Sequence, residues 1–85
     1  MNSALRGFPS EVRSLSETAF IHFPLLAFRA RDGRITEIEG TRPSALYGYV
    51  PREGDECWTD RTGCQWLIRV RSVGASLVGV AWPLS

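Results

Sequence analysis

The sequence predicts a mainly β domain, at the margin of the α+β class, with one short N-terminal helix and five or six antiparallel strands in hairpins. Three observations support this fold class. Runs rich in β-forming residues are separated by Gly-containing turns, some of these runs alternate apolar and polar residues, and helical patterning is confined to residues 9–18. Small antiparallel sheets of this kind curl into a partly open barrel, SH3-like or OB-like, or pack one helix on a curved sheet.

A single domain is expected to span residues 1–85, because the chain has no internal repeat, no low-complexity tract and no linker. The hydrophobic fraction is 44%, which is typical of a globular protein rather than a disordered one. A chain of 85 residues buries only roughly 60–65% of the surface that its unfolded form exposes. The core is therefore thin, and self-association would add stability.

The helix is expected over residues 9–18, PSEVRSLSET. Ser10 can cap its first turn, Glu11 suits the positive end of the helix dipole, and two apolar residues three apart share one face. Alternatively, Ser14 and Glu17 have the spacing of a capping box and would start a helix later. A helix over residues 9–18 has only about two turns, so most of the fold must come from strands.

A first hairpin is expected from Leu25 to Glu39, with Asp32-Gly33 as its turn dipeptide. Two registers are open for it. If Gly33 is the left-handed third residue of a three-residue loop, the pairs that face each other are Leu26 with Ile38 and Phe28 with Thr36. A two-residue loop shifts the pairing by one. The first register is preferred because it places apolar residues opposite apolar residues.

A third strand is expected from Ala45 to Val50, ALYGYV, after a loop from Gly40 to Ser44. Pro51 and the turn residues that follow it would end this strand. In a strand, Tyr47 and Tyr49 point to the same side, because successive side chains alternate between the two faces. The sequence therefore predicts two tyrosines on one surface.

A second hairpin is expected between Cys57 and Arg71, with a three-residue loop at positions 61–63. This loop places Trp58 across from Trp66, and such cross-strand aromatic pairs stabilise a sheet. Beyond the loop, Trp66, Ile68 and Val70 share one face, while Gln65, Leu67, Arg69 and Arg71 share the other. The period of two predicts a half-buried strand.

The final strand, Leu77 to Trp82, is apolar on both faces, and no charged residue follows Arg71. Such a strand is either central in its sheet or buried in a subunit interface. Gly79 in its middle indicates a bulge, a bend or close packing. The residues predicted to form an oligomer interface are Leu77, Val78, Val80 and Trp82.

No catalytic, cofactor-binding or metal-ligating residue is predicted. His22 is the single histidine, and no motif places a nucleophile or an orienting carboxylate beside it. Cys57 and Cys64 supply two thiols where a zinc site needs four ligands, so both are expected to be unbridged small apolar residues. The acidic residues Glu53, Asp55, Glu56 and Asp60 lack the spacing of a calcium loop and are expected to form a solvated turn.

Charge and hydropathy bear on partners and location. The ten basic residues are all Arg, and nine acids reduce the net charge to +1, whereas a dedicated nucleic-acid binder usually has a clear basic excess. The N-terminus, MNSALRGFPSEVRS, has no apolar segment of the secretory type. The uncharged run from Thr18 to Phe28 is too short to span a membrane, and Pro24 interrupts it. A soluble, cytoplasmic protein without a membrane partner is expected.

The aromatic residues are the best indication of function. Tyr, Trp and Arg are enriched in the cores of protein interfaces, and aromatic platforms also bind peptides or single strands. The predicted contact surface consists of Tyr47, Tyr49, Trp58, Arg61, Arg69 and Arg71. Small barrels that bind peptides or single strands use such aromatic platforms, and Arg69 and Arg71, on the polar face of their strand, could frame one.

Three functions are open. The preferred one is a non-enzymatic protein–protein interaction module that forms homo-oligomers through its final strand. The second is a small-barrel nucleic-acid-binding protein that stacks bases on Tyr47, Tyr49 and Trp58 and contacts phosphates with Arg. The third is a small-molecule-binding protein or an enzyme with a site between subunits, to which Glu37, His22 or the acidic turn of another chain could contribute catalytic groups. A deep pocket that holds a carboxyl of shifted pKa would indicate this third function.

Overall fold

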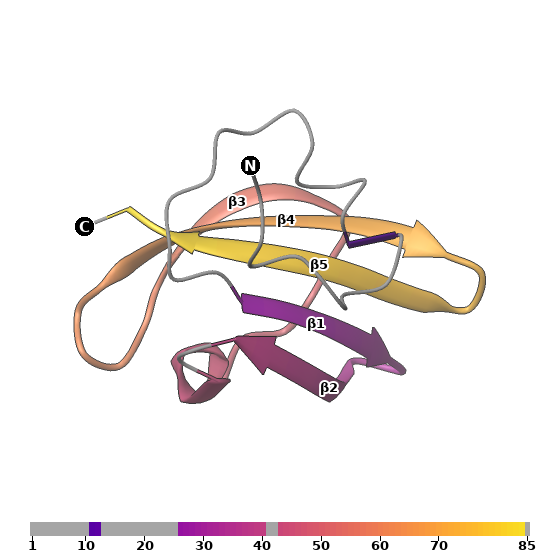
Figure 1. Ribbon diagram of the computed structural model, residues 1–85, viewed down its shortest axis with the longest axis horizontal. Helices are drawn as coiled ribbons and strands as arrows, with labels where there is room; N and C mark the ends of the chain where they lie inside the picture. The colour runs from indigo at the N-terminus through magenta and orange to yellow at the C-terminus, as the bar shows by residue number, and fades with distance from the viewer. Residues whose placement is uncertain (1–10, 13–25, 41–42, 85) are drawn as a thin grey trace.

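The computed structural model describes residues 11–12, 26–40 and 43–84, which contain one open antiparallel sheet of five strands (Figure 1). The strands are β1 (Leu26–Arg31), β2 (Arg34–Gly40), β3 (Gly54–Thr59), β4 (Gln65–Val73) and β5 (Ser76–Pro83), and a short 3-10 helix, η2 (Pro43–Leu46), lies between β2 and β3. The order across the sheet is β2-β1-β5-β4-β3. The prediction of a mainly β domain with antiparallel strands is confirmed.

The predicted SH3-like or OB-like barrel is not confirmed, because β2 and β3 are the two edges of the sheet and do not pair with each other. The segment between them packs on one face of the sheet instead of extending the ladder. The predicted helix over residues 9–18 is not confirmed either. Glu11 and Val12 are helical, and the rest of that segment lies outside the described residues. No helix in the described part of the chain is long and apolar enough to cross a membrane.

The β1–β2 hairpin has a two-residue turn, Asp32 and Gly33, with φ angles of 55° and 78°. Positive φ at both positions is the type I′ geometry that Asp-Gly favours, because its twist matches the twist of the strands. The observed pairs include Leu26 with Gly40, Phe28 with Ile38 and Ala30 with Ile35. The register preferred from the sequence is therefore wrong. The register shifts between Arg29 and Ala30, where β2 carries Thr36 as an extra residue whose hydroxyl donates to the Arg29 carbonyl at 3.2 Å.

The strand predicted over residues 45–50 is wrong, because η2 and a turn occupy this segment. The backbone N–H of Tyr47 donates to the Ser44 carbonyl at 3.1 Å, which closes a turn instead of a ladder. Gly48 then has a φ of 86°, a conformation that glycine adopts at little cost and a strand does not use. As a result, Tyr47 is 66% exposed while Tyr49 is 6% exposed, and the two tyrosines do not share a surface.

The second hairpin is confirmed in its loop and its register. Trp58 lies directly opposite Trp66, as the three-residue loop at positions 61–63 predicts. The N–H of Asp60 donates to the carbonyl of Cys64 at 2.9 Å and closes the loop. Burial along β4 alternates residue by residue, which confirms the predicted half-buried strand.

β5 lies in the middle of the sheet, paired with β1 on one side and with β4 on the other. Its central place explains why the final strand is apolar on both faces. Gly79 lies opposite Phe28 of β1, and a Cβ at position 79 would collide with the Phe28 ring. Both ladders of β5 are regular, so close packing is the reason for a glycine at this position.

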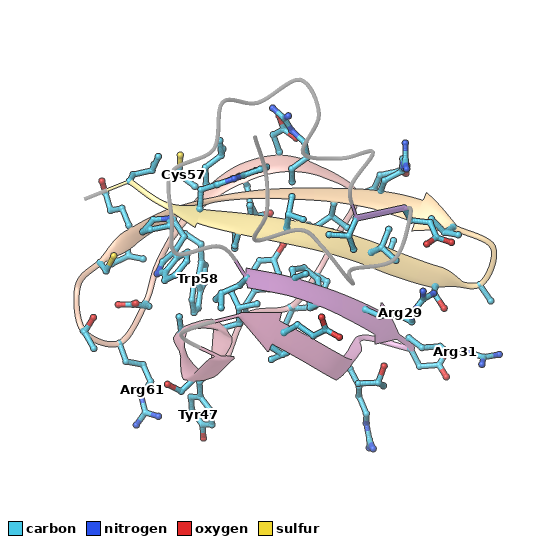
Figure 2. All side chains as sticks on the ribbon, in the orientation of Figure 1. Arg29, Arg31, Tyr47, Cys57, Trp58 and Arg61 are labelled. Carbon is cyan, nitrogen blue, oxygen red and sulfur yellow. The ribbon has the colours of Figure 1, made fainter. Side chains whose placement is uncertain are left out.

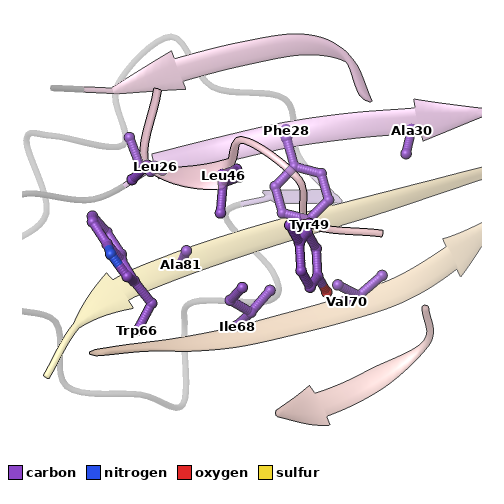
Figure 3. Packing of buried hydrophobic residues seen from close by; sticks show 10 residues of the cluster. Leu26, Phe28, Ala30, Leu46, Tyr49, Trp66, Ile68, Val70 and Ala81 are labelled. Carbon is purple, nitrogen blue, oxygen red and sulfur yellow. The ribbon is translucent and has the colours of Figure 1, made fainter. Parts of the chain in front are cut away.

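The buried side chains form two clusters on opposite faces of the sheet. The first contains Leu26, Phe28, Ala30, Ala45, Leu46, Tyr49, Trp66, Ile68, Val70 and Ala81 (Figure 3). The second contains Val12, Ala27, Val78, Val80 and Trp82. Alternation along β1, β4 and β5 sends neighbouring residues to different clusters. The first cluster continues beneath η2 and the turn that follows it, which brings this loop region onto the sheet.

Candidate contact surface

The loop between β3 and β4 is built around the carboxylate of Asp60, which is 7% exposed. One carboxylate oxygen accepts hydrogen bonds from the Thr62 N–H at 2.8 Å, the Thr62 hydroxyl at 2.7 Å and the Cys64 N–H at 3.0 Å. The other oxygen accepts a hydrogen bond from the Trp66 indole N–H at 2.9 Å. Asp60 was expected in a solvated turn, but it is buried and anchors the loop. Arg61 is therefore held at an exposed position beside this anchor.

The hydrogen bonds to Asp60 also determine its protonation. The Trp66 indole, followed by the Thr62 hydroxyl, holds the pKa of Asp60 far below its ordinary value, and burial only partly opposes this. The carboxylate therefore remains charged at any pH at which the domain would act. Because its oxygens are occupied by donors from its own loop, Asp60 has a structural role.

Arg61 stacks on Tyr47 at one corner of the molecule. The guanidinium carbon of Arg61 lies 4.4 Å from the centroid of the Tyr47 ring, and Figure 2 shows the two side chains next to each other. The tyrosine is 66% exposed. A cation–π contact at an exposed site contributes about 0.5–1 kcal/mol, so the contact orients the two side chains more than it stabilises the fold. The pair presents an aromatic ring and a guanidinium to solvent.

A pocket of about 310 Å³ lies between the loop after η2 and β3. It is lined by Gly48, Tyr49, Val50, Pro51, Arg52, Glu56 and Trp58. The Trp58 ring stands edge-on to Tyr49, with centroids 5.5 Å apart and an interplanar angle of 65°. Arg52 Nε and Glu56 Oε1 form an ion pair at 3.2 Å. The pocket thus combines aromatic and apolar walls with a charged pair, and Val50 beside it is 66% exposed.

Tyr49 is the innermost residue of this lining. Its hydroxyl is buried and has no hydrogen-bond partner among the described residues. Burial, and then the negative charge of Glu56, raise the pKa of Tyr49 to about 12, and the backbone N–H and the positive charge of Arg52 only partly offset these effects. This N–H lies near the hydroxyl without forming a hydrogen bond of good geometry. On its other side the ring packs edge-on against Phe28, with centroids 5.9 Å apart. Tyr49 is therefore a neutral packing group at physiological pH.

The residues predicted for the contact surface fall into two groups. Tyr47 is paired with Arg61, and Tyr49 is paired with Trp58, on the side of the sheet that η2 covers. Arg69 and Arg71 lie on the other face, because they alternate with the buried residues of β4. We call three members of the first group, together with two neighbouring exposed residues, the tyrosine–arginine surface; it consists of Tyr47, Val50, Arg52, Trp58 and Arg61. Tyr49 is left out of this surface because it is buried.

The two arginines on the other face are engaged within the chain. Arg69 faces Asp55 across the β3–β4 ladder and donates to both of its carboxylate oxygens at 3.1 to 3.2 Å. Its guanidinium carbon also lies 5.7 Å from the centroid of the Trp82 ring. Arg71 donates to the carbonyl of Glu11 at 3.3 Å. Both side chains therefore support the sheet from this face.

The residues predicted for an oligomer interface lie in β5. Val78, Val80 and Trp82 are buried in the second cluster, and Leu77 packs against the first cluster from the opposite face. Both hydrogen-bonding edges of β5 are used by β1 and β4. Within one chain, these four residues thus act as core.

The cysteines and acidic residues do not assemble a metal centre in the described part of the chain, where no group of three or more His, Cys, Asp or Glu lies close enough to hold an ion. Cys57 faces Leu67 across the β3–β4 ladder and is exposed, whereas Cys64 is half-buried. Both thiols are free, and the exposure of Cys57 does not fit the expected role of a small apolar residue. His22 lies outside the described residues.

Sequence reasoning missed the pocket beside Trp58, including the contributions of Val50 and Arg52. The signal was present, since Gly48 and Pro51 are three residues apart and both interrupt strands. Reading them as the ends of a loop would have placed Val50 on the surface, whereas the burial of Tyr49 in the same loop has no such local signal.

Comparisons of the chain with models of protein families, with curated proteins and with solved structures find no match. The function of the domain therefore has to be inferred from the exposure, contacts and charges of its own side chains.

Proposed function

We propose that this domain is a non-enzymatic protein–protein interaction module, and that the tyrosine–arginine surface is its contact surface. The observation that carries the proposal is the exposed Tyr47 ring, 66% accessible, with the Arg61 guanidinium stacked on it. Tyr, Trp and Arg are the residue types that contribute most binding energy in protein interfaces. A stacked Tyr–Arg pair beside an aromatic pocket has the composition of such an energetic centre.

The geometry favours a partner segment with one apolar side chain and one carboxylate. The pocket of about 310 Å³ is at the small end for a drug-sized ligand, and its aromatic wall suits a single apolar side chain. Arg52, whose side chain is 79% exposed, lines the pocket and is paired with Glu56, and Arg61 adds a second guanidinium on Tyr47, the residue before Gly48 of the lining. A carboxylate on the partner would pair with one of these guanidinium groups.

An enzymatic function has less support from the same residues. Among the described carboxyl groups, Asp60 is the one with a strongly shifted pKa, but it is hydrogen-bonded to its own loop and does not line the pocket. Glu56, which does line the pocket, is paired with Arg52. These arrangements suit recognition better than proton transfer.

A single-stranded nucleic acid is the second candidate ligand, because an unpaired base could stack on Tyr47 beside Arg61. The net charge of +1 favours a protein partner over a polyanion. Binding of an oligonucleotide with a steep dependence on salt would reverse this preference.

The module is also proposed to self-associate and to act in the cytoplasm, where Cys57 and Cys64 would stay reduced. The β5 residues are already buried within one chain, which favours a different surface for the contact between copies.

The test is affinity capture from the native host with immobilised wild-type protein and two variants, Tyr47→Ala and Arg61→Ala. Arg31→Ala is the matched control, because Arg31 is also exposed at a hairpin end but lies far from Tyr47 in Figure 2. We expect one specific partner to be retained by the wild type and by the control, and to be lost by both surface variants. A partner that binds all four proteins equally would contradict the proposed surface.

A further inference from the structure

Among the described residues, no strand pairs with the outer edge of β3, so backbone hydrogen-bonding groups along this edge are unused. The hydrogen bond from the Asp60 N–H to the Cys64 carbonyl makes residues 60 and 64 a hydrogen-bonded pair, and this fixes which later pairs of the β3–β4 ladder are hydrogen-bonded. The Leu84 N–H donates to the Gln65 carbonyl from the opposite side of β4, which agrees with this pattern of pairs. Because hydrogen-bonded and non-hydrogen-bonded pairs alternate in an antiparallel ladder, the residues that direct their N–H and C=O groups away from β4 are Asp55, Cys57 and Thr59.

This edge is open and regular, whereas the other edge of the sheet is protected. β2 carries a bulge at Thr36 and exposed charges at Arg34 and Glu39, and bulges and charges both discourage strand addition. β3 has no register shift against β4, and its outward-directed residues Cys57 and Thr59 are exposed and uncharged. β3 is therefore the edge that can accept another strand.

The carboxylates of β3 do not oppose such an addition. Asp55 is held by a bidentate contact to Arg69, and Glu56 is held by Arg52 at 3.2 Å. A strand that approached this edge would thus meet carboxylates that already have cationic partners, which reduces the cost of removing water from them.

We propose that two copies of the chain associate through antiparallel pairing of β3 with β3, with Cys57 on the two-fold axis. The inference rests on the proposed self-association and adds the surface and the register. A two-fold axis at Asp55 or Glu56 would place identical charges opposite each other. An axis at Trp58 or Thr59 would leave about half of the strand unpaired. An axis at Cys57 pairs residues 55–59 of each copy and is the arrangement that avoids both problems.

Charge complementarity supports the antiparallel arrangement. Glu53 precedes β3 and Arg61 follows it, so a two-fold axis at Cys57 brings the acidic end of one strand toward the basic end of the other. Glu53 also accepts a hydrogen bond from the Ser72 N–H at 3.4 Å and Arg61 lies in the turn, so this is complementarity between the strand ends rather than a cross-strand pair. Asp55 then faces Thr59 of the second copy, an uncharged residue. A single pair of short strands buries little surface, so we expect a weak, reversible dimer.

Cross-linking tests the register directly. Oxidised glutathione converts two Cys57 thiols to one intermolecular disulfide and is itself reduced to two glutathione thiols. The control is Ala75→Cys in a Cys57→Ser background, because Ala75 is exposed in the β4–β5 turn, away from β3. We expect Cys57 to cross-link at least about tenfold faster than this control at equal concentration, since pairing raises the local thiol concentration. Peptide mapping should find Cys57 joined to Cys57.

A second pair of variants tests the same register without oxidation. Thr59→Asp places a carboxylate opposite Asp55 of the other copy, and Thr59→Arg places a guanidinium there. Sedimentation velocity of the reduced proteins should show a dissociation constant raised about fivefold by Thr59→Asp and lowered about fivefold by Thr59→Arg. Both shifts should decrease at high ionic strength.

Opposite shifts together with fast cross-linking at Cys57 support the edge-paired dimer. Equal shifts for the two Thr59 variants, or a Cys57 rate no faster than the Ala75→Cys control, would overturn it. The partner-capture experiment on Tyr47 and Arg61 does not involve Thr59, so a failed edge leaves the proposed recognition function standing. A dimer whose dissociation constant is the same in both Thr59 variants would point to self-association through another face.

Discussion

β5 and the tyrosine–arginine surface use similar large side chains in opposite ways. Val80 of β5 is fully buried, whereas Val50 of the surface is 66% exposed. Trp82 is 5% exposed and Tyr47 is 66% exposed. The difference comes from place in the topology, since β5 has a strand on each side and the loop after η2 has the sheet on one side only. The most apolar segment is therefore core, and the exposed large side chains lie in a loop of mixed composition.

The largest expected effect on stability comes from substituting the two valines of this comparison, Val80 and Val50. Val80→Arg places a charge in a fully buried position without a partner, and we expect it to cost more than about 4 kcal/mol in the free energy of unfolding. Val50→Arg makes the same change at an exposed position and should alter stability by no more than about 0.5 kcal/mol. Urea unfolding monitored by tryptophan fluorescence measures both.

A folded and stable Val80→Arg protein would show that β5 is not the centre of a single-chain core. If Val80→Arg were instead monomeric and merely less stable, while the wild type was a dimer, β5 would be part of the interface after all. Sedimentation of both proteins separates these two cases.

The sequence predicted the parts of the fold whose pattern is local. The three-residue loop closed by Gly63 and the alternation from Trp66 to Val70 were sufficient to predict the β3–β4 hairpin and its register. The uniformly apolar pattern of β5 predicted burial on both faces but left open whether a neighbouring strand or another subunit covered it. The order of the strands depends on contacts between distant segments, which no local pattern encodes.

The incorrect predictions have a common physical cause. ALYGYV alternates like a strand, but Gly48 adopts a φ of 86° and turns the chain, so Tyr47 and Tyr49 diverge. In the first hairpin, Asp32 adopts a φ of 55° in a two-residue turn, which moves the register by one from the expected three-residue loop, and the extra residue at Thr36 moves it once more. A single residue in an unusual conformation changes which side every later residue faces. The sequence could predict which residue types form the candidate contact surface. It could not predict which of them lie side by side, because that depends on these backbone conformations.

The second-largest expected effect on stability comes from the loop between β3 and β4 that supports Arg61. Asp60→Asn keeps the size of the side chain but replaces an acceptor oxygen by an amide donor, which would face the donors Thr62 or Trp66. We expect the melting temperature to fall by about 5 °C or more. Asp32→Asn is the control, because Asn tolerates the left-handed conformation at φ 55° in an exposed turn. Equal melting temperatures for the two variants would contradict the anchoring role of Asp60.

The Asp60 carboxylate should also make the stability of the folded protein depend on pH in the acid range. The pKa of Asp60 is lower in the folded protein than its ordinary value of 3.8, so its contribution to stability is complete above that value. The contribution is lost as the pH falls below 3.8 toward the lower folded pKa. Stability of Asp60→Asn should therefore vary less with pH in this range than stability of the wild type.

The third expected effect is on stability at alkaline pH, where the buried Tyr49 and the exposed Tyr47 should behave differently. The pKa of Tyr49 is raised from 10.0 to about 12, so the folded state holds this proton more tightly than the unfolded state. Stability is therefore complete below pH 10 and falls by up to about 2 kcal/mol as the pH rises to about 12. Tyr49→Phe removes this loss, and it should be neutral or stabilising by up to about 1 kcal/mol at neutral pH, because the buried hydroxyl has no partner among the described residues. Tyr47→Phe is the control and should behave like the wild type in alkaline urea titrations.

The smallest expected effect on stability is at the centre of the proposed contact surface. Tyr47→Ala and Arg61→Ala should each change the free energy of unfolding by no more than about 0.5 kcal/mol, because both positions are exposed. A double-mutant cycle should give a coupling of about 0.5 kcal/mol from the contact at 4.4 Å. The same substitutions should abolish partner capture. A coupling above about 2 kcal/mol would instead make the Tyr47–Arg61 pair a stabilising element of the fold, and its exposure would then no longer argue for recognition.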